Sequence, residues 1–370
     1  MPGPASGLSN DMDPHLVDVV VIGAGQAGLS AAYFLRHRGF EPGSGFVVLD
    51  ADPGPGGAWQ HRWESLTVGR AHRIAPLPGM PFEPDDDDRP AREVVAEHYG
   101  RYEEAFDLRV RRPVRVRRVH DHPDGRLRVV SDAGTWATRA LINATGTWTR
   151  PHWPHYPGRE SFRGRQLHTA GYRAAEDFAG QHVVVVGGGH SAVQHLAEIS
   201  EVTSTTWVTR RPPRWREGPF DEEAGRAAVA LVEQAVREGR PPDSVVSVTG
   251  LVVTPAVAAA RERGVYRRLP MFDRITPDGV AWDDGRFVRA DVILWATGFR
   301  PALDHLAPLR LREPSGGIRM VGTRTARDPR VHLVGYGPSA STIGANRAGR
   351  VAVREIRQLL GRDSPERTAA

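Results

Sequence analysis

The sequence contains neither cysteine nor lysine among its 370 residues. Without cysteine the chain forms no disulfide, no thiolate metal site and no redox dithiol of its own, so any electrons that it moves need a cofactor. It also lacks a run of about 18 apolar residues, the length of a membrane-spanning helix. Residues 1–15 are rich in Pro, Gly and Ser and show no signal-peptide pattern. We therefore expect a cytoplasmic protein without membrane contact.

All 49 basic residues are arginine, and they stand against 44 acidic residues, which leaves a net charge of +5. The arginines are spread along the chain among nearly as many carboxylates, which is typical of a solvated surface rather than a nucleic-acid interface. The densest run, residues 109–118, interleaves arginine with valines such as Val114 and predicts a strand with one buried face. We expect a small-molecule substrate as partner and no nucleic acid.

An apolar run at residues 17–22 leads directly into the motif Gly23-Ala24-Gly25-Gln26-Ala27-Gly28. The first glycine allows a tight turn, the second lets the backbone approach a pyrophosphate, and the third lets the following helix pack on the strand. A helix is expected over residues 29–37 and a second strand over 46–49. That strand ends at Asp50, whose carboxylate can bind ribose hydroxyls. This region is predicted to be a dinucleotide-binding βαβ unit.

The same arrangement recurs where residues 183–186 lead into Gly187-Gly188-Gly189-His190-Ser191-Ala192. Each unit is followed by a strand that ends in Ala-Thr-Gly, at residues 144–146 and 296–298, which suggests a diverged internal repeat. The second unit has Arg210 and Arg211 where the first has its carboxylate. Arginine there can pair with a 2′-phosphate, which favours NADP over NAD, although two ordinary surface arginines are the alternative.

After the second Ala-Thr-Gly the chain offers a strand near residues 330–334, a turn at Gly335 and a helix over 343–360. We expect an α/β protein with two Rossmann-like domains, the second inserted in the first. The expected segments are a tail at 1–15, an FAD-binding domain at 16–165 and 299–362, an NADP-binding domain at 166–298, and a tail at 363–370. Two nucleotide sites without cysteine suggest that one holds a flavin and the other feeds it hydride. The insert at 217–268, helical in pattern at 233–240, either caps the cleft or forms a dimer surface, so a homodimer stays open.

The sequence resembles the class B flavin-dependent monooxygenases, which include the flavin-containing monooxygenases and the plant YUCCA enzymes. The turn Gly56-Gly57-Ala58-Trp59 resembles the family's turn beside the flavin, and residues 66–82 resemble the segment that follows it. Residues 162–172, which read Phe-x-Gly-x-x-x-His-x-x-x-Tyr, match the fingerprint at the start of the NADP domain. Residues 296–299, Ala-Thr-Gly-Phe, resemble the linker at its end.

This resemblance implies an NADPH-reduced FAD enzyme that inserts one oxygen of O₂ into a small organic substrate through a flavin hydroperoxide. An NADPH-dependent flavin reductase or diaphorase, which passes electrons to another acceptor without oxygenation, is the alternative. A binding module that senses dinucleotides is a third hypothesis. Arg173, after the fingerprint tyrosine, departs from the Baeyer-Villiger pattern, so ketone oxygenation is less favoured.

The resemblance carries over His168 and Tyr172 as catalytic residues. We expect His168 to couple NADP binding to flavin access rather than to donate a proton, while a plain core histidine is the alternative. The role of a family asparagine near the flavin is either unfilled or taken by His72, and no metal-ligand cluster is expected. The cofactor-binding residues are predicted to be Gly23, Gly25, Gln26, Ala27, Gly28, Asp50, Gly57, Trp59, His72, Val114, Ala144, Thr145, Gly146, Gly187, Gly189, His190, Ser191, Ala192, Arg210, Arg211, Ala296, Thr297, Gly298, Gly335 and Ile343.

Overall fold

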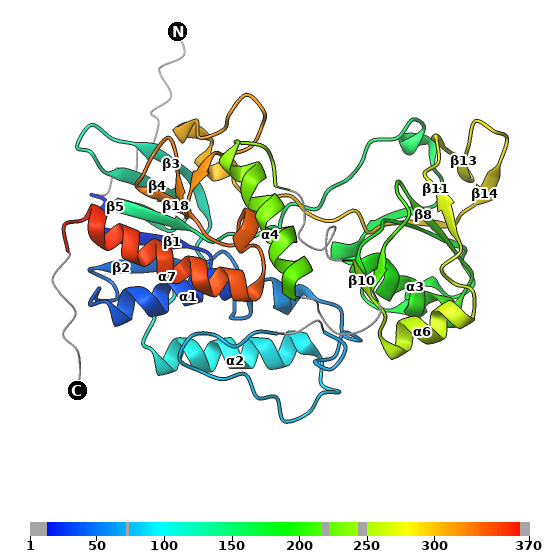
Figure 1. Cartoon of the computed structure of the whole chain (residues 1–370), viewed down its shortest axis with the longest axis horizontal. Coiled ribbons are helices and arrows are strands. Elements are labelled where there is room, and N and C mark those ends of the chain that lie inside the picture. The colour runs from blue at the N-terminus through cyan, green and yellow to red at the C-terminus, as the bar shows by residue number, and fades with distance from the viewer. Residues whose placement is uncertain (1–12, 72–73, 217–221, 243–249, 363–370) are drawn as a thin grey trace, which may run out of the picture.

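The computed structural model describes residues 13–71, 74–216, 222–242 and 250–362. The chain forms two lobes, each built on its own β-sheet with helices packed against it (Figure 1). This α/β architecture with two parallel-sheet cores confirms the predicted fold class. None of the helices in the described ranges is long and apolar enough to cross a membrane.

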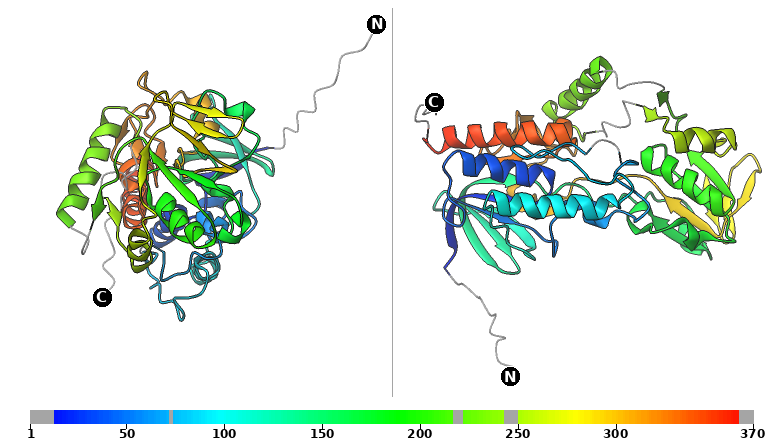
Figure 2. Two further views of the ribbon diagram at one scale, coloured as in Figure 1. Left: turned by 90° about the vertical axis from the view of Figure 1, so that its right-hand side faces the viewer. Right: turned by 90° about the horizontal axis from the view of Figure 1, so that it is seen from below.

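The first lobe contains an eight-stranded sheet whose central strands, in the order β18-β5-β1-β2, are parallel. Val19, Val20 and Val21 of β1 are fully buried, because helices cover one face of the sheet and an antiparallel meander covers the other. Figure 2 shows the helices layered on one side of the sheet. The elements of this lobe are β1 (His15–Ile22), α1 (Gln26–His37), β2 (Phe46–Leu49), α2 (Ala91–Ala105), β3 (Val116–Asp121), β4 (Leu127–Ser131), β5 (Gly134–Asn143), β16 (Met320–Val321), β17 (Arg324–Thr325), β18 (Val331–Leu333) and α7 (Thr342–Leu359).

The second lobe contains a five-stranded parallel sheet in the order β11-β8-β7-β15-β6. Strands β7 and β15 are apolar throughout, and Trp207 and Trp295 are among the fully buried side chains of the lobe. A three-stranded antiparallel sheet, β12-β13-β14, and a short β9-β10 pair complete the lobe. Its elements are β6 (Arg165–His168), β7 (Val183–Val186), α3 (His190–Val202), β8 (Thr205–Thr209), β9 (Trp215–Arg216), β10 (Leu251–Val252), α6 (Pro255–Glu262), β11 (Arg268–Pro270), β12 (Arg274–Thr276), β13 (Gly279–Ala281), β14 (Phe287–Arg289) and β15 (Val292–Trp295).

Among the described residues, one segment after β5 and one after β15 cross between the lobes. They run side by side, because backbone hydrogen bonds join Ala302 N to Gly146 O at 3.0 Å, Arg300 N to Arg150 O at 2.8 Å, and His152 N to Gly298 O at 2.9 Å. The carboxyl ends of β5 and β15 therefore face the same region, where these two segments pass between the lobes.

Helix α4 (Glu222–Arg237) lies within the range expected for the second domain but packs on the first lobe (Figure 1). Val236 is buried in the same apolar cluster as Leu303 and Tyr336, and the Ser315 hydroxyl donates to the carbonyl oxygen of Gly239. The helix expected over 233–240 thus begins earlier, at Glu222. It packs on the first lobe, although β9 before it and β10 after it belong to the second lobe. The domain boundaries themselves stay a prediction.

Three local expectations are wrong. Residues 109–118 do not form one strand: β3 begins only at Val116, because Arg112 turns inward to buried carboxylates. Helix α1 begins at Gln26 rather than residue 29, because the glycine turn leads straight into it. Strand β1 begins at His15, inside the expected tail.

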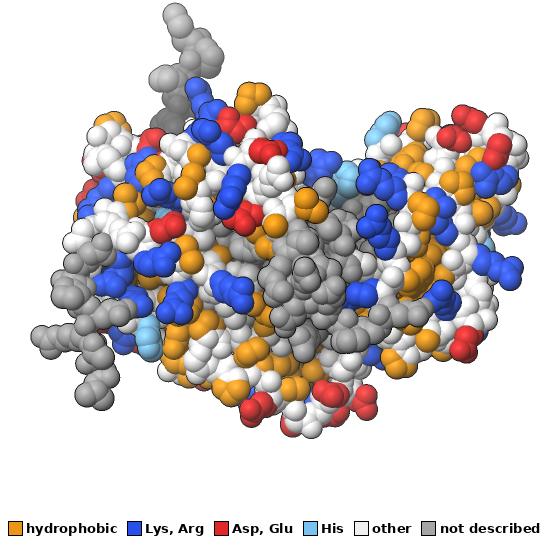
Figure 3. Space-filling model, in the orientation of Figure 1, with side chains coloured by type: hydrophobic (Ala, Val, Ile, Leu, Met, Phe, Trp, Pro, Cys, Tyr) orange, Lys and Arg blue, Asp and Glu red, His pale blue; other side chains and the backbone are white. Residues whose placement is uncertain are grey.

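Charge on the face drawn in Figure 3 is mixed, with arginine side chains over both lobes and acidic side chains among them. Many arginines are paired with carboxylates at the surface, for example Arg89 with Glu97 at 2.6 Å. This distribution agrees with a solvated surface.

Candidate functional site

Both glycine motifs occupy the same position in their lobes, at the carboxyl end of a central strand. In the first lobe Gly23 N donates to Leu49 O at 2.8 Å, and Ala144 N donates to Ile22 O at 2.8 Å. In the second lobe Gly187 N donates to Val208 O at 3.0 Å, and Ala296 N donates to Val186 O at 2.8 Å. Each motif therefore packs against the Ala-Thr-Gly segment of its own lobe. The two lobes thus repeat the same backbone arrangement, as the sequence suggested.

The first and third glycines are required by the fold itself. Gly23 has φ +96°, and a Cβ there would lie 2.6 Å from Ala144 O. A Cβ on Gly28 would lie 1.8 Å from Gly23 O. In the second lobe a Cβ on Gly187 would lie 2.2 Å from Ala296 O. Side chains at these positions would break the close packing of turn on strand.

The second glycine of each motif is different, because the protein leaves room around it. A Cβ on Gly25 would meet nothing closer than Gly57 Cα at 3.8 Å, and a Cβ on Gly189 would meet nothing within 4 Å. These glycines are the N-caps of α1 and α3, and neither helix has a side-chain cap or an acidic residue in its first turn. Uncapped N–H groups beside open space form a site suited to a phosphate.

Several other predicted residues gather around the first turn. A Cβ on Gly57 would lie 2.7 Å from Gly25 Cα, and one on Gly335 would lie 3.4 Å from Ala27 Cβ. The Gln26 amide accepts from Tyr99 OH at 2.7 Å and donates to Asn346 at 2.9 Å. The structure thus brings together segments that are some 300 residues apart in the chain.

The start of α7 also belongs to this neighbourhood. Ser341 caps the helix by accepting from Gly344 N at 3.1 Å, and Ile343 is 54% exposed. An exposed isoleucine at a helix start is available to cover a flat ligand. Predicted His72 lies outside the described residues.

Asp50 follows β2 as expected, but it is buried and already paired. Its Oδ2 accepts from Arg112 Nε at 2.9 Å, and the other nitrogens of Arg112 contact Glu103 at 2.6 and 2.7 Å. Burial raises the pKa of Asp50 even though Arg112 opposes the shift. Val114 N donates to Asp50 O at 2.7 Å, which places this predicted residue beside it. The role of Arg112 was not predicted, because nothing in the 109–118 pattern marks one arginine as buried.

Arg210 and Arg211 lie exposed just beyond β8, next to the start of α3. Within the described part of the chain, neither guanidinium forms an ion pair or hydrogen bond. Ala192 is fully buried under the turn, and His190 Nε2 accepts from Val252 N at 3.4 Å. Two free cations beside the second glycine turn are suited to a phosphate.

His168 is 2% exposed and ends β6 at the crossing. Its Nδ1 accepts from Ala170 N at 3.1 Å, so its Nε2 carries the proton and donates to Gly298 O at 3.1 Å. Burial lowers its pKa, which favours the neutral ring. His168 therefore holds the segment after β15 in place, which fits the expected coupling role better than proton transfer.

Tyr172 is 3% exposed, and its hydroxyl donates to Glu198 Oε2 at 2.8 Å. Burial raises the pKa of Tyr172 above its ordinary value, so it does not ionise near neutral pH. The same carboxylate oxygen accepts from Ser65 of the first lobe at 2.9 Å, and Trp63 packs edge-on against Tyr172 at 5.8 Å. Tyr172 is thus part of the packing between the lobes, which does not support a catalytic role.

Two aromatic residues without a predicted role lie at the crossing. Trp148 follows the first Ala-Thr-Gly and Phe299 follows the second, and their rings stack with centroids 5.0 Å apart. The Arg62 guanidinium lies 4.8 Å from the Trp148 centroid and 5.9 Å from that of predicted Trp59. An aromatic residue within two positions of each Ala-Thr-Gly, Trp148 after the first and Phe299 after the second, was the available signal.

Other Ala-Thr-Gly residues tie the crossing together. Thr145 Oγ1 donates to Ala302 O at 2.7 Å, and Thr297 Oγ1 donates to His152 O. Gly146 and Gly298 are exposed there.

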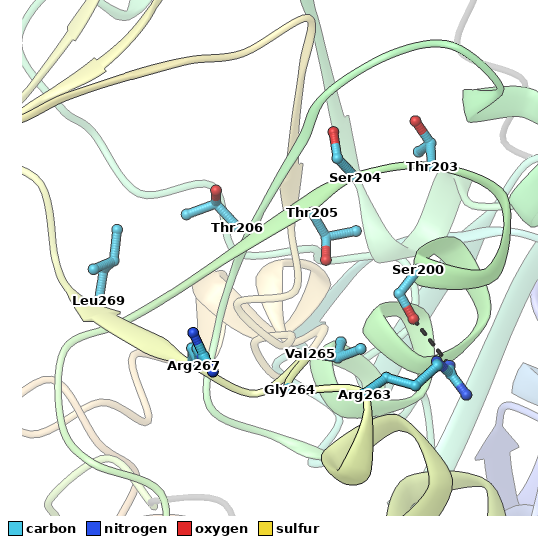
Figure 4. A pocket seen from close by; sticks show the side chains of 10 residues that line it. All are labelled: Ser200, Thr203, Ser204, Thr205, Thr206, Arg263, Gly264, Val265, Arg267 and Leu269. Atoms are coloured by element: carbon cyan, nitrogen blue, oxygen red, sulfur yellow. Dashed lines mark hydrogen bonds between the residues drawn. The ribbon is translucent and has the colours of Figure 1, made fainter.

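A hollow of about 430 Å³ lies elsewhere, between the end of α3 and the start of β8 (Figure 4). Ser200, Thr205 and Arg263 line it, and Arg263 donates to Ser200 at 3.2 Å. The hollow lies at the amino end of β8, whereas Gly187 follows the carboxyl end of β7, so it is not part of the candidate site. Over the described ranges, no group of three or more metal-ligating side chains comes together.

Comparisons with known proteins agree with this geometry. Residues 20–224 match the family model described as pyridine nucleotide-disulphide oxidoreductase. The structure is similar to that of a flavin-containing monooxygenase from Stenotrophomonas maltophilia, with 41% sequence identity, a TM-score of 0.79, and coverage of 93% of this chain and 99% of that one.

Two curated proteins are similar at lower coverage. Indole-3-pyruvate monooxygenase YUCCA1 of Oryza sativa subsp. japonica is 28% identical over 76% of each chain. The uncharacterized oxidoreductase CzcO of Bacillus velezensis is 30% identical over 54% of this chain, and the match spans 56% of that protein, little more than half its length.

Proposed function

The chain belongs to the pyridine nucleotide-disulphide oxidoreductase family and to its flavin-containing monooxygenase-like members, and from this we propose that it is an FAD-dependent monooxygenase reduced by NADPH. Because it has no cysteine, it cannot reduce disulfides through thiols of its own. The substrate would be a small organic molecule, with O₂ as the second reactant.

The room around Gly25 and Gly189 carries this proposal. Neither glycine is required by backbone conformation or by packing, so its lack of a side chain is explained by a ligand that approaches the backbone closely. Both face uncapped helix N-termini, which suit the pyrophosphate of a dinucleotide. Two such sites, one in each lobe, fit two dinucleotides.

The residues around each turn fit FAD in the first lobe and NADP in the second. Gly25, Gly57 and Gly335 would lie against FAD, with Asp50 near its ribose. Arg210 and Arg211 would bind the 2′-phosphate, because they are cations without partners among the described residues. Bound FAD would supply the redox chemistry, accepting a hydride from NADPH and activating O₂.

The protein's own contribution is to position and shield the reactants. His168 holds the second crossing segment through Gly298, and the stacked rings of Trp148 and Phe299 lie where the two lobes meet. Apolar rings at this point exclude water from the space between the cofactors. His168 would take no part in proton transfer, because both nitrogens of its ring are hydrogen-bonded to backbone groups.

The test is to reduce the purified protein with NADPH in the absence of O₂, admit O₂ with thioanisole, and measure sulfoxide and H₂O₂ against NADPH consumed. A monooxygenase forms sulfoxide in proportion to NADPH, whereas a flavin reductase releases H₂O₂ without sulfoxide. Protein that binds no FAD would contradict both. A cytoplasmic location and a homodimer stay predictions.

A further inference from the structure

Residues 63–66 are fixed to the first lobe by their backbone, but their side chains pack into the second lobe. Ala91 N, at the start of α2, donates to Leu66 O at 2.9 Å. The side chains of Trp63 and Leu66 are only 3% and 6% exposed. They lie in one apolar cluster with Tyr172 and with side chains of β7, α3 and β15. The core of the second lobe thus contains two side chains of the first.

Ser65 lies between these two residues and bonds directly to α3. Its hydroxyl donates to Glu198 Oε2 at 2.9 Å, and the Tyr172 hydroxyl donates to the same oxygen at 2.8 Å. Tyr172 and Glu198 both belong to the second lobe, so of these two hydrogen bonds only the one from Ser65 joins the lobes. A hydrogen bond to a carboxylate is directional, whereas apolar contacts are not. Ser65 therefore fixes the angle at which residues 63–66 meet the helix.

The aromatic rings beside Ser65 contact each other by packing. Trp63 and His195 of α3 lie with their ring centroids 4.7 Å apart. The Nε1 atom of Trp63 and both ring nitrogens of His195 are buried, and none of the three has a hydrogen-bond partner in the described part of the chain. This packing holds residues 63–66 against α3 without fixing their orientation. The orientation is left to the hydrogen bond from Ser65.

The bond connects the surroundings of the two glycine turns. Residues 63–66 follow the 3₁₀-helix Gly57–His61, and Gly57 lies so close to the first turn that a Cβ on it would be 2.7 Å from Gly25 Cα. Glu198 lies on α3, about 14 Å along the helix from its N-cap Gly189 in the second turn. A shift of α3 against residues 63–66 would therefore move the second turn relative to the first.

We propose that Ser65 is a positioning residue for the reduction of FAD by NADPH, because its hydrogen bond to Glu198 holds the two glycine turns at a fixed distance and angle. This rests on the proposed function, in which a hydride passes from NADPH to FAD and leaves NADP⁺ and reduced FAD. Ser65 acts only through Glu198 and takes no part in the bond changes. A small displacement between hydride donor and acceptor slows such a step strongly, so Ser65 controls the rate rather than the affinity for the coenzyme.

The first measurement is the rate of anaerobic reduction at saturating NADPH, with the full-length protein and its FAD. In Ser65→Ala the rate should fall about tenfold, while FAD content and the dissociation constant for NADP⁺ stay within about twofold of the wild type. Ser65→Thr keeps a hydroxyl, so most of the rate should return. Tyr172→Phe removes the other donor to Glu198 without loosening the lobes, and should change the rate by no more than about twofold. Ser131→Ala is the matched control, because the Ser131 hydroxyl donates to Gly134 O within the first lobe.

The second measurement reports on the lobes without any need for activity. Because the chain has no cysteine, spin labels can be attached to two introduced ones alone. Arg101→Cys on α2 and Glu262→Cys at the end of α6 place one label at an exposed position of each lobe. Pulsed electron paramagnetic resonance then gives the distribution of distances between the labels. It should be narrow in the wild-type and Tyr172→Phe backgrounds and broader in Ser65→Ala.

The two measurements together decide the proposal. Slower reduction of Ser65→Ala without a broader distribution, or a broader distribution without slower reduction, would overturn it. Equal slowing in Ser65→Ala and Tyr172→Phe would overturn it too, since the hydrogen bonding of Glu198 rather than the link between the lobes would then set the rate. A wild type that binds no FAD, or is not reduced by NADPH, would contradict the proposed function instead, and the label distances would still decide whether Ser65 fixes the lobes. Thermal midpoints identify any variant that fails to fold.

Discussion

The imidazole Nε2 of His168 donates to the carbonyl oxygen of Gly298 at 3.1 Å, joining residues 130 positions apart in the chain. His168 ends β6, the first strand of the second lobe, and Gly298 follows β15, its last. The hydrogen bond therefore ties the point where the chain enters the second lobe to the point where it leaves. The Phe299 ring packs edge-on against the imidazole at 5.0 Å, so the bond also fixes a ring at the crossing.

Loss of this hydrogen bond should affect hydride transfer more than FAD binding. In His168→Ala the Gly298 carbonyl loses a buried donor, so we expect anaerobic reduction by NADPH to slow at least about tenfold while FAD content stays normal. In His168→Gln the amide nitrogen can take the place of Nε2, so much of the rate should return. Equal rates in the wild type and His168→Ala, measured by stopped-flow absorbance, would contradict this role.

A matched pair of glycine variants should separate the two nucleotide sites. Gly25→Ala and Gly189→Ala both fit their surroundings, so each should fold with an unchanged thermal midpoint. The added methyl stands where a pyrophosphate approaches, so Gly25→Ala should lose FAD. Gly189→Ala should retain FAD but bind NADPH at least about tenfold more weakly. Gly28→Ala is the opposite control, since its Cβ would collide with Gly23 O and prevent folding.

Sequence patterns predicted those parts of the site that follow from local geometry. The glycine turns, the Ala-Thr-Gly segments and the strands that carry them depend on neighbouring residues, and the structure places them as pairs in both lobes. The partners of Asp50 depend on which of many arginines is buried, and that is decided by distant packing. For the same reason the docking of α4 on the first lobe has no local signal, since Val236 packs against residues far away in the chain.

Tyr172 should prove to be a packing residue. Tyr172→Phe removes the hydroxyl that donates to Glu198, while Ser65 still donates to that carboxylate. Loss of one buried hydrogen bond to a charged group should lower the free energy of unfolding by about 2 kcal/mol. Because the hydroxyl points into the protein, reduction by NADPH should change by no more than about twofold. A loss of a hundredfold or more in that rate at unchanged stability would show instead that Tyr172 takes part in the reaction.

Arg210 and Arg211, which have no partner among the described residues, should determine the choice of coenzyme. In the double variant Arg210→Gln/Arg211→Gln two cations disappear from the second glycine turn, so the KM for NADPH should rise at least about tenfold. The KM for NADH should stay nearly constant, because NADH lacks the 2′-phosphate. Arg163→Gln, a change at an exposed arginine of the second lobe paired with Asp278, serves as the charge control. Equal increases for both coenzymes would assign these arginines to general nucleotide binding.

Buried histidines should make the protein sensitive to mild acid. Burial lowers the pKa of His332 to about 3, of His195 to about 3 and of His305 to about 4. In the unfolded chain each would titrate near its ordinary value of 6.5, so between these values the unfolded state binds more protons and the native state loses stability as the pH falls. Stability from this source is complete above pH 6.5 and declines below it.

His332 isolates one such contribution far from the crossing. It is 1% exposed on β18, its Nδ1 contacts the Thr323 hydroxyl at 2.9 Å, and its Nε2 has no partner in the described part of the chain. Between pH 7 and pH 5 this one residue should cost the wild type about 2 kcal/mol of unfolding free energy. His332→Asn cannot take up the proton, so its urea unfolding curves should shift less between these two pH values by that amount. Equal shifts for both proteins would mean that His332 is already protonated in the native state at pH 5, or that another group controls the acid sensitivity.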